Sequence, residues 1–167
     1  MGRGRLRDAL RESIADGALV PGEAHEALAS YDCAAAIVTT NCLDTLLDKA
    51  CTRWRRVVVD ADLSASGNTR DLIYLHGHRD FSDSWVMTRS QYEDFPRQKP
   101  VIASRVRQLL AQHPWLVVGF SMSDANFHAI TRLLGNEMRG HQPLSLVLMT
   151  GPRPMPSVNT GELWASR

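Results

Sequence analysis

Three short apolar runs, each followed at once by polar residues, constrain the fold of this chain more than any other feature. The segments lie at 37–41, 72–77 and 116–121. Runs rich in valine, isoleucine and leucine are typical of strands buried on both faces of a parallel sheet. Ligands bind outside the carboxyl ends of such strands. The polar residues Asn41, His76 and Ser121 are therefore predicted to converge on one site.

The rest of the chain alternates predicted strands with predicted helices. Further strands are expected at 56–59 and 144–149, and helices at 6–15, 22–30, 43–51, 90–95, 100–112 and 124–134. Alternation of this kind predicts an α/β fold, with a Rossmann-like parallel sheet and helices on both of its faces. The basic residues Arg53, Arg55 and Arg56 are interpreted as a solvated edge.

Length and composition favour one domain. The chain has 167 residues, of which 44% are hydrophobic, enough for a real core. We expect a domain over 1–150 and an irregular tail over 151–167. The 19 basic and 18 acidic residues give a net charge of +1, which disfavours direct binding to nucleic acid or to an anionic membrane. Without a membrane-spanning run or a secretory signal, a cytoplasmic location is predicted.

The cysteines indicate neither a disulfide framework nor a structural zinc site. There are three, Cys33, Cys42 and Cys51, and their spacing contains no paired C-x2-C pattern. His76 and His78 are spaced as two metal ligands, but no third ligand with a suitable spacing accompanies them. The sequence therefore predicts a site without metal.

The same segments resemble, in order, the signature of the SIR2-like family, relatives of sirtuins. The resemblance is carried by Thr39-Thr40-Asn41 with Asp44, by Leu75-His76-Gly77, by residues 85–92 and by residues 119–127. Many members of that family consume NAD in bacterial anti-phage defence. The resemblance implies NAD as a substrate, and the missing zinc cysteines shift the expected activity from deacylation toward NAD hydrolysis.

Hydrolysis of the bond between nicotinamide and ribose passes through an oxocarbenium-like transition state, as glycoside hydrolysis does. An amide side chain orients a water or a ribose hydroxyl by donating and accepting at once. An imidazole takes a proton near neutral pH. Asn41 and His76 match the family's catalytic asparagine and histidine. The alternative for Asn41 is the cap of a helix that starts near Cys42, and the alternative for His76 is a histidine that closes a strand.

The resemblance assigns nucleotide binding to a further set of residues: Thr40, Asp44, Gly119, Ser121 and Asp124. Glycine at position 119 permits close approach of a ligand, and a following helix N-terminus offers N–H groups to phosphate. A serine and an aspartate that cap this helix are the alternative. In the family an aspartate usually stands two positions after the asparagine, whereas Asp44 here stands three after it. One residue turns a helical side chain by about 100°.

The chain departs from the family pattern in having no strand followed by a glycine-rich, phosphate-binding turn before residue 37. We therefore expect a fold that is incomplete at its N-terminus, with exposed apolar edges. A homo-oligomer or a partner defence protein would cover them. Two alternatives to NAD hydrolysis stay open: a catalytically inactive SIR2-like binding or assembly module, and an NAD-dependent protein deacylase.

Overall fold

The computed structural model describes residues 19–42, 45–64, 69–119 and 145–148, together with residues 4, 5, 8, 9 and 12. The chain divides into a first unit, residues 1–103, and a second unit, residues 104–167. The predicted tail at 151–167 lies outside the described residues. In the described part of the chain, no helix has the length and apolar character needed to cross a membrane.

The first unit is built on a parallel sheet of three strands. Its strands are β1 (Ala36–Thr39), β2 (Arg55–Val57) and β3 (Asp71–Tyr74), in the spatial order β1-β3-β2. Thr39 lies opposite Tyr74 in the β1–β3 register, and Val57 lies opposite Ile73 in the β2–β3 register. All four residues of β3 are buried. A central strand covered on both faces explains why this segment reads as a continuous apolar run.

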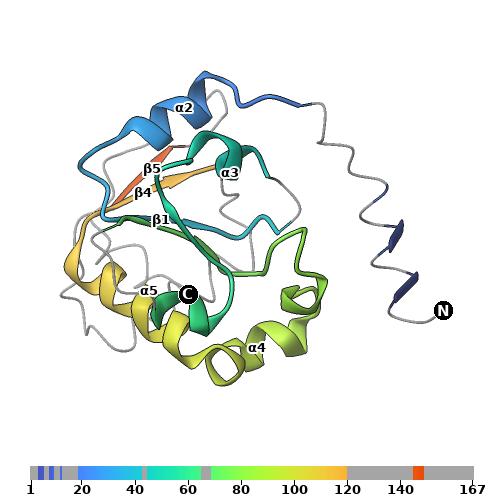
Figure 1. Cartoon of the computed structure of the whole chain (residues 1–167). Coiled ribbons are helices and arrows are strands. Elements are labelled where there is room, and N and C mark those ends of the chain that lie inside the picture. Colours follow the sequence, from blue (N-terminus) through green and yellow to red (C-terminus); the bar gives the residue numbers. More distant parts are fainter. Residues whose placement is uncertain are drawn as a thin grey trace. The chain divides into compact units, whose positions relative to one another are not determined.

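Helices lie on both sides of this sheet, as predicted. Helix α2 (Glu23–Ser30) contacts helix α3 (Leu46–Ala50), and both lie on one side of β1, while α4 (Arg89–Gln98) lies on the other side (Figure 1). The α3 helix is shorter than the helix predicted at 43–51, since it begins only at Leu46 with Thr45 in the N-cap position.

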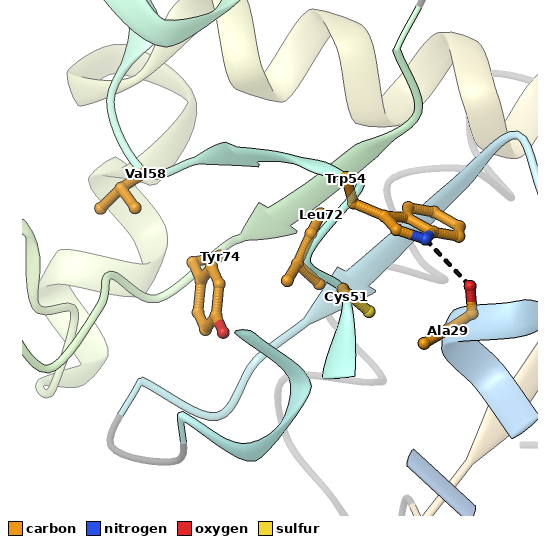
Figure 2. Packing of buried hydrophobic residues seen from close by; sticks show 6 residues of the cluster. All are labelled: Ala29, Cys51, Trp54, Val58, Leu72 and Tyr74. Carbon is orange, nitrogen blue, oxygen red and sulfur yellow. Dashed lines mark hydrogen bonds between the residues drawn. The ribbon is translucent and has the colours of Figure 1, made fainter. Parts of the chain in front are cut away.

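A hydrophobic cluster joins α2 and α3 to the sheet (Figure 2). Its buried members are Ala29, Cys51, Trp54, Val58, Leu72 and Tyr74. Leu72 and Tyr74 are two residues apart on β3, so both side chains point to the same face of the sheet. The indole Nε1 of Trp54 donates to the carbonyl of Ala29 across 3.0 Å, which satisfies the one polar atom of a buried ring.

The interpretation of the arginine cluster as a solvated edge holds for Arg56, which is exposed on the edge strand β2, but it was wrong for Arg55, which is partly buried. Nε and Nη2 of Arg55 lie 2.8 and 2.7 Å from Oδ1 of Asp71, whose side chain is buried. Nη1 of Arg56 lies 2.7 Å from Oδ2 of Asp48. The acidic partners are 16 and 8 residues away from their arginines, and a local pattern cannot reveal such pairs.

Polar side chains fix where the next two helices begin. The predicted start of α4 at Ser90 was wrong, because Thr88 is the N-cap and forms a capping box with Gln91. Helix α5 (Pro100–Gln112) has the predicted bounds. Its first turn is capped by a distant residue: the carboxylate of Asp60 accepts the N–H groups of Val101 and Ile102 at 3.1 and 3.0 Å. Asp60 belongs to the 3-10 helix η2 (Asp60–Ser64).

The second unit contains the remainder of α5 and two strands, β4 (Trp115–Val118) and β5 (Ser145–Leu148). These strands pair in parallel, with Trp115 opposite Ser145 and Val118 opposite Leu148. The indole Nε1 of Trp115 donates to the carbonyl of Leu110 at 2.7 Å. Both predicted strands of this region are therefore present.

Candidate functional site

Thr40 and Asn41 directly follow β1, at the carboxyl end of the strand. Asn41 is exposed, and its backbone N–H donates to Oγ1 of Thr39 at 3.2 Å. The alternative role of Asn41, as the cap of a helix that starts near Cys42, falls on residues 43 and 44, which lie outside the described residues; at α3 the N-cap position belongs to Thr45.

His76 follows the neighbouring strand β3, and its imidazole reaches the end of β1. Its side chain is buried, with 5% of the residue exposed, and Nδ1 lies 3.1 Å from the carbonyl oxygen of Thr40. A carbonyl oxygen can only accept, so the hydrogen bond requires the ring proton to be on Nδ1. The lone pair of the neutral ring then lies on Nε2, which is the ring atom that can accept a proton.

A tight turn holds the backbone of His76. The N–H of Leu75 donates to the backbone carbonyl of Thr39 at 2.9 Å, which continues the pairing of β3 with β1 up to the histidine. Gly77 follows with a φ of +92°. A Cβ at this position would overlap the backbone carbonyl of Ser84, so only glycine fits both the left-handed conformation and the close approach. The N–H of Val86 donates to the His76 carbonyl at 3.0 Å.

An aromatic ring flanks the imidazole of His76. The ring of Tyr92, on α4, meets it edge to face with centroids 4.6 Å apart. Tyr92 belongs to the segment 85–92 that resembles the family, but nothing in the sequence places it against the histidine. The edge-to-face contact restricts rotation of the ring and shields one of its faces.

His78, which the sequence suggested only as a metal ligand, has a different role in the structure. The side chain is completely buried, and Nε2 lies 3.2 Å from Oδ2 of Asp48 on α3. The same carboxylate oxygen contacts Arg56. Partial burial by itself would raise the pKa of Asp48, but the contacts with His78 and Arg56 outweigh it and hold this pKa below its ordinary value. Asp48 therefore remains an anion at neutral pH.

Two nearby features do not contribute to this arrangement. Burial raises the pKa of the Cys42 thiol, although a backbone hydrogen bond opposes the rise, so this residue beside Asn41 is protonated near neutral pH. A cavity of about 510 Å³ lies in the first unit, lined by Asp60, Phe81 and Lys99 among others. None of the predicted site residues lines it.

The remaining predicted residues are not all described. Gly119 follows β4 in the second unit and has a φ of +73°, a conformation that favours glycine. Asp44, Ser121 and Asp124 lie outside the described residues. Within the described ranges, no group of three histidine, cysteine, aspartate or glutamate side chains is placed to hold a metal ion.

A family model described as a SIR2-like domain matches residues 35–166, which include every predicted site residue. The chain belongs to the SIR2-like domain family. It is similar to Defense-associated sirtuin 2 from Bacillus subtilis, with 23% identity over 132 residues. The match covers 72% of this chain and 13% of that relative, so the chain spans only a small part of the relative's length. A SIR2-like domain is an α/β fold, as the sequence pattern and the parallel sheet indicate.

Proposed function

We propose that this SIR2-like chain carries an NAD-hydrolysing site that cleaves NAD to nicotinamide and ADP-ribose. One observation carries the proposal: Asn41 and His76 follow adjacent parallel strands, and the Thr40 carbonyl holds the ring proton of His76 on Nδ1. The carboxyl end of a parallel sheet is where α/β proteins bind ligands. The Asn and His pair also matches the family's catalytic residues.

In the proposed reaction Asn41 orients the attacking water or a ribose hydroxyl, since its amide both donates and accepts. Nε2 of His76 accepts the proton that this water or hydroxyl releases as the oxocarbenium-like transition state collapses. Nicotinamide departs as a neutral molecule from a cationic precursor, so the site needs orientation more than a strong acid. Tyr92 and Thr40 keep the imidazole in place for this step.

The nucleotide portion of NAD is assigned to Thr40, Asp44, Gly119, Ser121 and Asp124, as the resemblance implies. The relative's name associates it with defence, and we extend this to propose an anti-phage role for the present chain. A cytoplasmic location and association with a second copy or a partner defence protein stay predictions.

The test is NAD consumption by the purified chain, with nicotinamide and ADP-ribose quantified, beside Asn41→Ala and His76→Ala variants. We expect turnover in the wild type and losses of at least about 100-fold in both variants. A folded wild type that binds NAD without turnover would instead support the binding or assembly module. Release of a free lysine from an acyl-lysine peptide, dependent on NAD, would support the deacylase.

A further inference from the structure

His78 stands two residues after His76, and its polar atoms are held from several directions. Nδ1 accepts the backbone N–H of Asp80 at 3.2 Å, while Nε2 lies 3.2 Å from Oδ2 of Asp48. Its N–H donates to Oγ of Ser84 at 3.1 Å, and its carbonyl accepts Nε1 of Trp85 at 2.7 Å. Nδ1, the backbone N–H and the carbonyl of His78 are thus hydrogen-bonded, whereas the buried Nε2 faces the Asp48 carboxylate without a well-aligned hydrogen bond. These contacts therefore hold the residue in one position.

The contacts also assign the ring proton of His78. The backbone N–H of Asp80 can only donate, so Nδ1 of His78 is the acceptor and the proton lies on Nε2, facing Asp48. The Nε2 contact is an attraction between a ring dipole and a carboxylate rather than a well-aligned hydrogen bond. His76 and His78 thus carry their ring protons on opposite nitrogens, and each proton faces an acceptor on the chain between β1 and the end of α3.

This arrangement links the two proposed catalytic segments twice. The first link joins Thr40 to His76 across 3.1 Å, and the second joins Asp48 to His78 across 3.2 Å. Thr40 precedes Asn41 and Asp48 follows it, so the links lie on either side of Asn41 in the sequence. With one link alone, the two segments could still rotate relative to each other. Two links fix both the distance between the segments and their relative orientation.

We propose that Asp48 and His78 are positioning residues, which act through the Gly77 turn to hold the imidazole of His76 in register with Asn41. The inference rests on the proposed function for its catalytic consequence, although the geometric part can be measured without turnover. Arg56, whose side chain is more exposed than that of Asp48, supports the link by pairing with the same Oδ2 of Asp48.

The matched variants are His78→Gln and His78→Asn in the full 167-residue chain. Glutamine places an amide N–H near the position of Nε2 and keeps a donor for Asp48, whereas asparagine places its amide near Nδ1 and loses that donor. Asp48→Asn removes the charge from the other side of the contact. Trp54→Phe serves as a stability control, since it removes a buried hydrogen bond to Ala29 without touching the site.

The first readout is the ring ¹⁵N spectrum of His76, recorded without NAD. We expect the wild type and His78→Gln to show the proton on Nδ1. His78→Asn and Asp48→Asn should show a mixture of tautomers or a broadened His76 signal. In these variants Nδ1 of His76 is no longer held facing the carbonyl oxygen of Thr40. Trp54→Phe should leave the signal unchanged at a temperature where all the variants are folded by circular dichroism.

The second readout is NAD turnover. We expect kcat to fall at least about tenfold in His78→Asn and Asp48→Asn, since misplacement by about 1 Å is sufficient for such a loss. His78→Gln should stay within about threefold of the wild type, with KM for NAD changed less than about threefold in all. Trp54→Phe should retain wild-type kcat even if its melting temperature falls further than that of the other variants.

An unchanged His76 spectrum in both His78→Asn and Asp48→Asn would overturn the proposal, as would kcat losses that follow melting temperature across all variants including Trp54→Phe. If the spectrum changes as expected but the wild type consumes no NAD, the positioning link stands and the proposed hydrolysis fails. If Asp48→Asn does not fold, the comparison of His78→Gln with His78→Asn still tests the positioning role.

Discussion

The carbonyl oxygen of Thr40 and Nδ1 of His76, 3.1 Å apart, join the ends of two neighbouring parallel strands. A backbone group thereby decides which nitrogen of the imidazole holds its proton. Because the deciding atom belongs to the main chain, the register of β1 against β3 is itself part of the site. A shift of this register would move the carbonyl away from the ring.

Substitution of His76 by asparagine should separate stability from activity. Its amide N–H lies near the position of Nδ1 and can still reach Thr40, but there is no atom in the place of Nε2 to accept a proton. We expect NAD turnover to fall at least about 100-fold while the free energy of unfolding changes little. His76→Leu should lose activity equally and also about 1–3 kcal/mol of stability, because the Thr40 carbonyl is left without its donor. Denaturant unfolding of both variants checks this, and equal stabilities would contradict the assigned contact.

Replacement of Gly77 by alanine should destabilise the first unit. The φ of +92° costs an L-residue about 1–2 kcal/mol, and overlap of the new Cβ with Ser84 adds an overpacking cost of about 1–3 kcal/mol. Gly119→Ala is the matched control, because its φ is also positive while no atom of the described residues lies within 4 Å of the added Cβ. The loss measured by urea unfolding should therefore be clearly larger for Gly77→Ala. Similar losses would show that the Ser84 carbonyl moves aside.

Loss of the carboxylate of Asp71 should cost far more than loss of an exposed one. Asp71→Ala removes the carboxylate that the guanidinium of Arg55, whose side chain is 21% exposed, contacts at 2.7 Å, and removal of one member of a buried pair costs about 3 kcal/mol or more. Glu93→Ala breaks the pair with Arg89 on the surface of α4, where both side chains are well exposed. Its melting temperature should be indistinguishable from that of the wild type. Equal effects in the two variants would contradict a structural role for the Arg55–Asp71 pair.

The lowered pKa of Asp48 predicts a pH dependence of stability. A carboxylate whose folded pKa lies below its unfolded value of 3.8 contributes stability above that value, and this is lost as the pH falls through the folded pKa. Unfolding free energies of the wild type and Asp48→Asn should therefore converge as the pH falls below about 4, with the wild type more stable at pH 6. Curves that stay parallel from pH 6 to pH 3 would mean that the carboxylate is not stabilised by folding.

The strands could be predicted because each one corresponds to a local pattern in the sequence. The apolar runs predicted the bounds of β1, β3 and β4 to within one or two residues. Asn41 and His76 could be placed near each other by the rule that parallel strands end at one edge of a sheet. The role of His78 could not be predicted in this way. Its burial depends on Asp48, which is 30 positions earlier, and no periodicity connects a histidine in a turn to an aspartate on a helix.

The start of α3 shows the same limit in another form. The apolar spacing of Leu43, Leu46 and Leu47 predicted a helix from residue 43, yet the helix begins at Leu46. Helical spacing tells which side chains share a face, but it does not say which residue takes the N-cap position when none makes a side-chain cap, as is the case for Thr45. Asn41 was a plausible cap by residue type alone.

The central position of β3 has a consequence for how the first unit is made. Both β1 and β2 pair with β3, which is the last of the three strands to leave the ribosome. Until residue 74 has been synthesised, neither earlier strand has its partner in this sheet, although both are already complete. At about 5–20 residues per second, the 35 residues that separate Ala36 from its partner Asp71 correspond to a delay of seconds. Synonymous codons that slow translation between β1 and β3 would lengthen this interval, and they should lower the yield of folded protein without changing a single amino acid.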